Sequence, residues 1–253
     1  MQVMIFSGTT EGKELSRLLA ERGEAVTVSV ATEYGGEEQG EQPGVTTLQG
    51  RMPVEEMEKR LRGMDLCVDA THPYAQRVSA SIRTACAAAG VELHRLLRPA
   101  SELPEGALVF PDASGAAAFL REQTGNILLT TGAKELSAWR DMDPERLFPR
   151  ILPTHESLSA CEALGVPHRN ICAMQGPFSV EMNAALLRQT GTVWLVTKDG
   201  GVPGGFPEKA EAAARTGARL IVLRRPEETG ESFDEVLRAC LERMDARQHD
   251  RIR

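Results

Sequence analysis

Short apolar runs alternate with helical patterns along most of this chain, and glycines stand where several of the runs end. Val3–Phe6 is followed by Gly8 and Gly12, after which leucines mark one face of a helix. Further strand-like runs occur at Ala25–Val30, Leu66–Val68, Asn126–Thr130, Val193–Thr197 and Arg219–Leu223. Strands that alternate with helices of this length form parallel, doubly wound sheets. Ligands of such sheets bind outside the carboxyl ends of the strands.

The alternation stops once, at residues 99–106, where prolines, acidic residues and a glycine cluster. This composition is typical of a linker between domains. The pattern restarts beyond it and ends with an amphipathic helix over Phe233–Arg243. We therefore expect an α/β protein with two Rossmann-like parallel-sheet domains, residues 1–99 and 107–243, and a cleft between them.

Composition excludes several classes of protein. The 253 residues are 42% hydrophobic and 26% charged, as in soluble globular proteins. No apolar run approaches the ~18 residues of a membrane span, and the first residues resemble a strand more than a signal peptide. A net charge of −7 disfavours nucleic-acid binding. Five scattered cysteines favour a reducing cytoplasm and no structural metal site. The oligomeric state stays open.

The loop Asp69–Ala75 reads Asp-Ala-Thr-His-Pro-Tyr-Ala and joins a buried strand to a helix. Pro73 fixes its own φ and disfavours helical backbone at His72, so the loop begins extended. Thr71, His72 and Tyr74 thus gather polar groups at a strand end, which favours a ligand site. The simpler alternative is a helix cap with a tyrosine packed on the sheet.

Two glycine turns precede helices that share the sequence Lys-Glu-Leu. One contains Gly8, Thr9, Thr10 and Gly12, and the other contains Gly132. Backbone N–H groups at the positive end of a helix suit a phosphate or carboxylate. Neither turn forms Gly-x-Gly-x-x-Gly, so a plain turn stays an alternative. For a phosphate site we expect Gly12→Val to weaken dinucleotide binding and leave the fold intact.

A third glycine loop follows the strand Val193–Thr197. It begins at Lys198 and carries four glycines, at 200, 201, 204 and 205. Because each glycine costs conformational entropy on folding, close approach to a ligand is one reason to keep them. The loop would then cover a ligand, with Lys198 at its base as a charge or proton donor. A flexible surface loop is the alternative.

Several blocks together resemble one family, the precorrin-6A reductases of cobalamin biosynthesis. These blocks are residues 8–12, 29–35, 69–75, 95–99, 130–132, 196–198, 204–209 and 224–226, in the family's order. The resemblance implies an NADPH-dependent enzyme that reduces one double bond of the precorrin macrocycle and gives precorrin-6B. Relatives often read Lys-Glu/Asp-Ser-Gly where this chain has Lys198-Asp199-Gly200-Gly201.

The resemblance also implies residue roles. Catalysis would involve Lys198, Tyr74 and His72, with Lys198 orienting a proton source. NADPH would be bound by Gly8, Thr9, Thr10, Gly12, Ser29, Thr32 and Thr71, where the hydroxyls of Ser29 and Thr32 suit a 2′-phosphate. The carboxylates of the tetrapyrrole substrate would meet Arg77, Arg95, Arg98, Gly132, Gly204, Gly205, Lys209 and Arg224. Each of these cations has a plain alternative as a solvated surface charge.

Two other classes of protein stay open on the residues alone. A short-chain or nucleotide-sugar dehydrogenase shares the α/β beginning, but no Tyr-x-x-x-Lys pair stands out for proton transfer. A module that binds a dinucleotide without chemistry would bind NADPH and turn over no tetrapyrrole. The residues do not distinguish a cobalt-containing substrate from a metal-free one.

Overall fold

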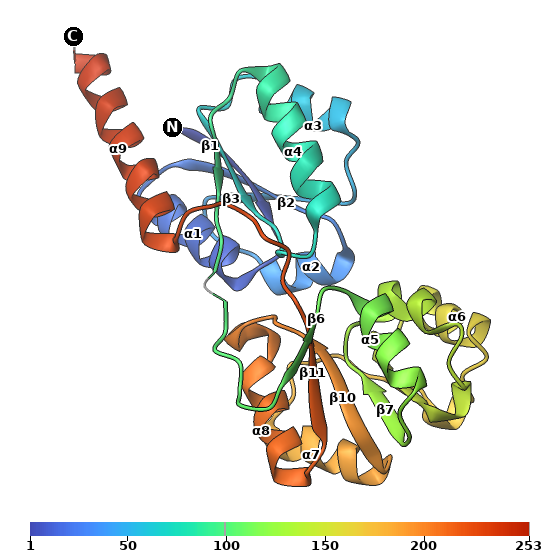
Figure 1. Cartoon of the computed structure of the whole chain (residues 1–253). Helices are drawn as coiled ribbons and strands as arrows, with labels where there is room; N and C mark the ends of the chain where they lie inside the picture. Colours follow the sequence, from blue (N-terminus) through green and yellow to red (C-terminus); the bar gives the residue numbers. More distant parts are fainter. Residues whose placement is uncertain (99, 253) are drawn as a thin grey trace. The chain divides into compact units, whose positions relative to one another are not determined.

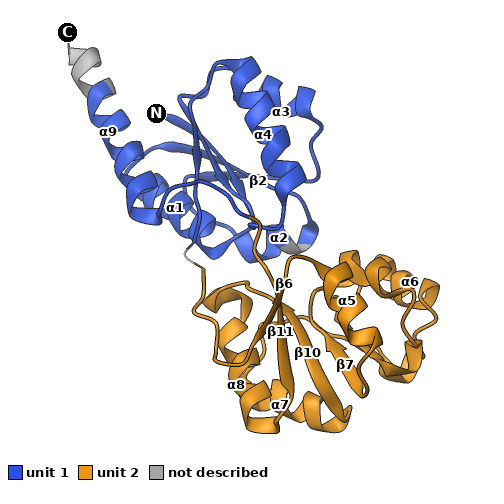
Figure 2. Ribbon diagram, viewed as in Figure 1, with its two compact units in different colours: residues 1–99, 227–253 blue, residues 100–226 orange. Residues whose placement is uncertain are grey.

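The computed structural model describes residues 1–98 and 100–252 (Figure 1). They form two compact units (Figure 2): the first combines the chain up to residue 98 with the chain from Glu227, and the second is Ala100–Pro226. Pro99, the predicted end of the first domain, lies outside the described residues. The prediction that the second domain extends to residue 243 is wrong, because helix α9 (Phe233–Ile252) belongs to the first unit.

Hydrophobic packing explains where α9 belongs. Val236, Cys240 and Met244 lie in one core cluster with Leu15 and Leu19 of the first unit. The second unit thus interrupts the first unit in sequence, and the chain crosses between the two units twice.

The first unit contains a five-stranded parallel sheet. Its strands are β1 (Gln2–Ser7), β2 (Ala25–Val30), β3 (Val45–Gln49), β4 (Leu66–Ala70) and β5 (Leu93–Arg95), in the order β3-β2-β1-β4-β5. The strand order reverses between β1 and β4, which pair with Phe6 beside Asp69 and Ser7 beside Ala70. In open α/β sheets this reversal marks the ligand crevice.

Helices cover both faces of this sheet (Figure 1): α1 (Thr10–Glu21) and α9 on one face, α3 (Val54–Leu61) and α4 (Gln76–Ala89) on the other. Strand β1 is therefore buried on both sides. Val3 and Ile5 pack toward α1, whereas Met4 and Phe6 pack toward α3 and α4. This explains its continuous apolar run, since strands covered on both faces need not alternate.

The second unit contains a six-stranded parallel sheet. Its strands are β6 (Leu108–Phe110), β7 (Asn126–Leu129), β8 (Leu147–Ile151), β9 (Cys172–Ala173), β10 (Thr192–Lys198) and β11 (Arg219–Leu223), in the order β6-β11-β10-β7-β8-β9. Here the order reverses between β7 and β10. The predicted fold class, two parallel α/β sheets, is confirmed.

Helices also cover both faces of the second sheet. One core cluster joins α5 (Ala113–Arg121), α6 (His155–Ala163) and the 3-10 helix η1 (Ala133–Trp139), and the other joins α7 (Val180–Gln189) and α8 (Phe206–Thr216). Three short 3-10 turns complete the unit: η2 (Pro144–Arg146), η3 (His168–Asn170) and η4 (Val202–Gly204). Within the part of the chain that is described, no helix has the length and apolar character of a membrane span.

Helix α2 (Glu33–Gln39), which follows the second strand, was not predicted from the sequence. Two glycines, Gly35 and Gly36, disfavour a helix there. The helix forms because Thr32 caps it, accepting a hydrogen bond of 3.0 Å from the Gly35 N–H. At its other end Gln39 is buried, and its amide donates to Ser16 Oγ over 2.9 Å.

Candidate functional site

The loops that follow β1 and β4 lie together at the carboxyl edge of the first sheet. Gly8 is exposed, and a Cβ built on it would lie 3.7 Å from the His72 nitrogen and 3.8 Å from the Thr71 Cα. These are ordinary contact distances, so a methyl group on Gly8 would just reach the backbone of the loop after β4. The structure thus brings the predicted residues Gly8, Thr71 and His72 to one place.

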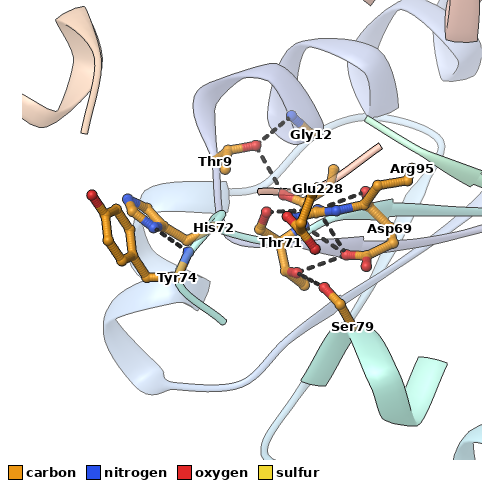
Figure 3. Close-up of polar contacts among 10 residues, drawn as sticks. Thr9, Gly12, Asp69, Thr71, His72, Tyr74, Ser79, Arg95 and Glu228 are labelled. Atoms are coloured by element: carbon orange, nitrogen blue, oxygen red, sulfur yellow. Dashed lines mark hydrogen bonds and ion pairs between the residues drawn. The ribbon is translucent and has the colours of Figure 1, made fainter. Parts of the chain in front are cut away.

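Thr9 ties these two loops together (Figure 3). Its Oγ1 accepts a hydrogen bond from the Gly12 N–H at 3.2 Å and donates one to the Ala70 carbonyl at 2.9 Å. Helix α1 therefore begins at a point fixed against the end of β4. The predicted cofactor-binding hydroxyl of Thr9 is used inside the protein, as an N-cap.

Gly12 serves close packing between helix and sheet. A Cβ there would lie 2.7 Å from Ser7 Oγ and 2.9 Å from the Ala70 Cβ, closer than real contacts allow. Since the Ala70 methyl cannot rotate away, α1 would have to move from the sheet. We therefore expect Gly12→Val to strain the packing of α1 on the sheet and to lower stability, in addition to any effect on a cofactor.

Asp69 organises the loop after β4 from inside the protein. Its Oδ1 accepts hydrogen bonds from the Thr71 N–H at 3.0 Å and from the Thr71 hydroxyl at 2.7 Å. Thr71 Oγ1 also lies 3.2 Å from Ser79 Oγ in the first helical turn beyond the loop. All three side chains are buried. The Thr71 hydroxyl, predicted to contact the cofactor, is committed to this network.

Arg95 completes the network (Figure 3). One of its terminal nitrogens donates to the Asp69 carbonyl, the Asp69 carboxylate and the Thr71 carbonyl at 2.9–3.2 Å. The other donates to Glu228 Oε2 at 2.8 Å. Arg95 is 8% exposed. Burial and these four hydrogen bonds commit the guanidinium to supporting the loop, in place of the predicted contact with substrate.

His72 and Tyr74 extend beyond the buried network and are partly exposed. The Tyr74 N–H donates to His72 Nδ1 over 3.4 Å, and the two rings lie 5.5 Å apart between centroids. Figure 3 shows both rings on the same side of the loop. The chain turns at Pro73 and Tyr74, where the Ala75 N–H donates to the His72 carbonyl over 2.7 Å, so the loop is not extended up to the helix as predicted.

The other residues of the first unit that were predicted to bind cofactor or substrate differ in burial and in their hydrogen-bond partners. Thr32 caps α2, Ser29 is buried in β2, and Arg77 is exposed in α4. The Thr10 hydroxyl donates to Glu11 over 3.1 Å. Arg98 is largely buried and forms an ion pair of 2.7 Å with Glu11. This ion pair neutralises a carboxylate in the first turn of α1, where it would repel a bound phosphate.

In the second unit, Lys198 lies at the end of β10, beside the reversal of strand order. Its ammonium group donates to Glu135 Oε1 over 2.7 Å. Glu135 lies in η1, three residues after Gly132, and also lines a hollow of about 480 Å³ beside α5. Glu135 was not predicted as a site residue, although it belongs to the second Lys-Glu-Leu repeat.

The glycine loop after Lys198 is held in place by Asp199. This buried carboxylate accepts hydrogen bonds from the Ser101 N–H and hydroxyl and from the Gly201 N–H at 2.7–3.1 Å. Burial raises the pKa of Asp199, but these bonds and Arg225 outweigh it and hold the pKa below its usual value. Gly201 and Gly205 have φ near +68° and +67°, which few other residues adopt.

Lys209 lies in the first turn of α8, and its ammonium group donates to the Gly204 carbonyl over 2.7 Å. Burial, with repulsion from Arg150, lowers the pKa of Lys209 to about 8, and Glu208 opposes that shift. Arg224 is exposed, and its backbone N–H donates to Phe110 over 2.7 Å. Gly204, Gly205 and Lys209 therefore lie together, whereas no hydrogen bond or ion pair among the described residues joins the Arg224 side chain to them.

Two parallel sheets, each with loops that follow the strands where its order reverses, define a two-unit, doubly wound α/β protein. A family model described as "Precorrin-6x reductase CbiJ/CobK" matches residues 2–241. The chain belongs to this family, and is thus a reductase of cobalamin biosynthesis. The resemblance inferred from the motifs is confirmed.

Individual relatives agree with the family model. The chain is 34% identical to the cobalt-precorrin-6A reductase of Methanothermobacter thermautotrophicus, over 90% of this chain and 77% of the relative. It is 35% identical to the cobalt-precorrin-6A reductase of Salmonella typhimurium, over 88% of this chain and 87% of the relative. A solved structure of CobK precorrin-6A reductase matches with a TM-score of 0.76 and 24% identity, covering 96% and 97% of the two chains. That structural likeness supports the fold.

Proposed function

We propose that this chain catalyses the NADPH-dependent reduction of one double bond in the macrocycle of precorrin-6A, or of its cobalt form, to give the precorrin-6B product. Family membership supports the reductase chemistry, and the relatives above are named for the cobalt-containing substrate. The observation that carries the cofactor assignment is the position of exposed Gly8 beside the Thr71–His72 backbone, where the order of the first sheet reverses.

The residues around Gly8 fit a dinucleotide pyrophosphate. The first turn of α1 leaves the N–H groups of Thr10 and Glu11 without acceptors inside the helix. Gly8 has no side chain to block their approach, and Arg98 offsets the charge of Glu11. Bound there, NADPH supplies a hydride. The hydroxyls of Ser29, near the end of β2, and of Thr32, just beyond it, favour a 2′-phosphate over an acidic side chain, although Ser29 is buried and Thr32 already caps α2.

The chain's own residues then orient the macrocycle and supply the proton. Reduction adds hydride to one carbon of the double bond and a proton to its neighbour. His72 and Tyr74 present two partly exposed rings on a loop that Asp69 and Arg95 hold rigid. Such a loop can hold the macrocycle in one orientation. Lys198, with Glu135 as its acceptor, would position the water that protonates the neighbouring carbon.

In this proposal the Asp69–Ala75 loop and the Lys198–Phe206 loop face one cleft. That arrangement stays a prediction from the sequence. Substrate carboxylates would meet exposed or partly exposed cations, of which Arg77, Lys209 and Arg224 are candidates.

Anaerobic NADPH oxidation, followed at the nicotinamide absorbance, tests the proposal. Precorrin-6A and cobalt-precorrin-6A are offered side by side, each with NADPH and with NADH. We expect oxidation to depend on a tetrapyrrole and to be faster with NADPH. Tight NADPH binding without turnover of either tetrapyrrole would instead favour a dinucleotide-binding module. Turnover that is equal with NADH would remove the proposed role of the 2′-phosphate.

A further inference from the structure

Arg150 is a buried cation with no carboxylate beside it. It lies near the end of β8, on the sheet face covered by α7 and α8, and is 8% exposed. Its guanidinium lies 4.4 Å from the centroid of the Phe178 ring and donates one hydrogen bond, of 2.7 Å, to Asn183 Oδ1. Within the described residues, no ion pair involves Arg150. Burial lowers its pKa to about 10.

The neighbours of Arg150 hold its guanidinium in one orientation. The Asn183 amide donates to the carbonyls of Phe178 and Ser179 at 3.1 and 2.8 Å. These two bonds fix the amide so that its oxygen accepts from Arg150, while the Phe178 ring covers one face of the guanidinium. An arginine side chain carries about five N–H donors, and among the described residues Arg150 uses one of them. Its other donors are therefore available to a planar oxyanion.

A second cation lies close enough to repel Arg150. Lys209 projects from the first turn of α8, and its interaction with Arg150 contributes to its lowered pKa. Glu208, the next residue back in the chain, opposes that shift. The N-cap of α8 is Gly205, which offers no side-chain acceptor, and a Cβ on it would lie 3.8 Å from both Pro177 and Glu208 Oε2. Glu208 thus supplies one negative charge at the positive end of the helix, beside the two cations.

Folding alone does not account for this arrangement. A buried charge without a counter-charge is destabilising, and apolar replacements of similar volume are often more stable. The partly exposed Lys209 adds repulsion, which a ligand with a negative charge would relieve.

We propose that Arg150 and Lys209, with Arg150 oriented by Asn183 and Phe178, form an oxyanion site that binds a side-chain carboxylate of the macrocyclic substrate. The identity of this ligand rests on the proposed function. A phosphate group shares the same chemistry, so the experiment must separate the two sources.

The test compares Arg150→Met and Lys209→Met with Arg219→Met in the full-length enzyme. Arg219 is a matched control, because it also stacks on an aromatic ring, with its guanidinium 4.3 Å from the Trp194 ring centroid. It is the first residue of β11 and so lies at the amino ends of the strands, whereas Arg150 lies near the carboxyl end of β8. For each protein we would measure KM and kcat for cobalt-precorrin-6A, NADPH affinity by fluorescence titration, and the melting temperature.

We expect Arg150→Met and Lys209→Met to raise KM about tenfold or more, as for the loss of a charge-assisted hydrogen bond. NADPH affinity should not change, and Arg150→Met should melt at the same temperature as the wild type or higher. Arg150→Lys should restore part of the loss, and Arg219→Met should keep the wild-type KM. A purely structural Arg150 would instead give a lower melting temperature with KM unchanged, and would overturn the proposal.

Two further outcomes also decide it. A fall in NADPH affinity with KM unchanged would assign the site to a cofactor phosphate and overturn the carboxylate site. If the wild type turns over neither tetrapyrrole, the proposed function fails, and citrate becomes the probe. The melting temperature in citrate is compared with that in sodium chloride of equal ionic strength. If citrate raises the melting temperature of the wild type but not of Arg150→Met, the oxyanion site is supported. Equal responses of the two proteins would overturn it.

Discussion

Gly8 and Gly12 lie four residues apart, and the structure predicts opposite consequences for substituting them. At Gly8 an added Cβ meets backbone atoms at 3.7 and 3.8 Å, so Gly8→Ala should change stability by no more than ~0.5 kcal/mol. At Gly12 the nearest atoms are at 2.7 and 2.9 Å, and one of them, the Ala70 Cβ, cannot turn aside. Gly12→Val should therefore cost about 1–3 kcal/mol by overpacking.

For NADPH affinity we expect the opposite ranking of the two variants: among folded molecules, Gly8→Ala should lose more affinity than Gly12→Val. A methyl group on Gly8 would stand where a pyrophosphate approaches the N–H groups of α1. Loss of one hydrogen bond to a charged group costs ~1.5–3 kcal/mol, or about 10- to 150-fold in Kd. Folded Gly12→Val, measured at a temperature well below its melting point, should lose less affinity than Gly8→Ala.

The assay is fluorescence titration of NADPH beside urea or thermal unfolding of the same preparations. Gly132→Ala serves as the comparison at the second glycine turn, although its φ of +84° will add strain of its own. The reasoning is refuted if Gly8→Ala keeps wild-type affinity. The phosphate would then lie elsewhere, with the turn at Gly132 as the next site to test.

Three other predictions concern charged side chains. Lys198→Ala should lower kcat by roughly ten- to a thousand-fold with the melting temperature kept, since it removes one positioned group; unchanged kcat and KM, measured beside Tyr74→Phe, would make Lys198 a bystander. Arg95→Met should destabilise the protein by ~3–5 kcal/mol in urea unfolding, because it leaves buried Asp69 without its cation; a loss below ~1 kcal/mol would contradict the supporting role. The pKa of Lys209 is about 8 in the folded protein, against 10.5 in the unfolded chain. Its positive charge therefore destabilises the fold below about pH 8, and the free energy of unfolding should rise as the pH increases from about 8 toward 10.5. Substrate KM should rise over the same range as the ammonium that faces Arg150 and Glu208 loses its proton, and a KM profile unaltered by Lys209→Met would refute this.

The sequence was sufficient for the fold because its local signals agree with one another. Apolar runs of a few residues, glycine turns and amphipathic helices follow in one order, and parallel sheets with helices on both faces satisfy them all. The helix α2 was missed because its support is tertiary: buried Gln39 is held by Ser16, which lies 23 residues away in the chain. Propensity alone gives no signal for such a contact.

The candidate site was predicted less completely, for a related reason. The sequence located the loops, but residue type did not reveal whether a charge points outward or inward. Arg95 was predicted to meet substrate and is buried against Asp69, a partner 26 residues away. Arg150 gave one signal that was overlooked: a charged residue between Pro149 and Ile151 in a short strand.

Because the first unit is interrupted in sequence, it cannot be completed until the second unit has been synthesised. A ribosome completes all five strands of the first sheet before it begins residues 100–226, and makes α9 only afterwards. Until then Val236, Cys240 and Met244 are missing from the cluster around Leu15 and Leu19, and one face of the sheet is incompletely covered. Exposed apolar surface of this kind promotes aggregation of nascent chains. The nascent first unit would therefore need either a chaperone or rapid folding of the second unit during this interval.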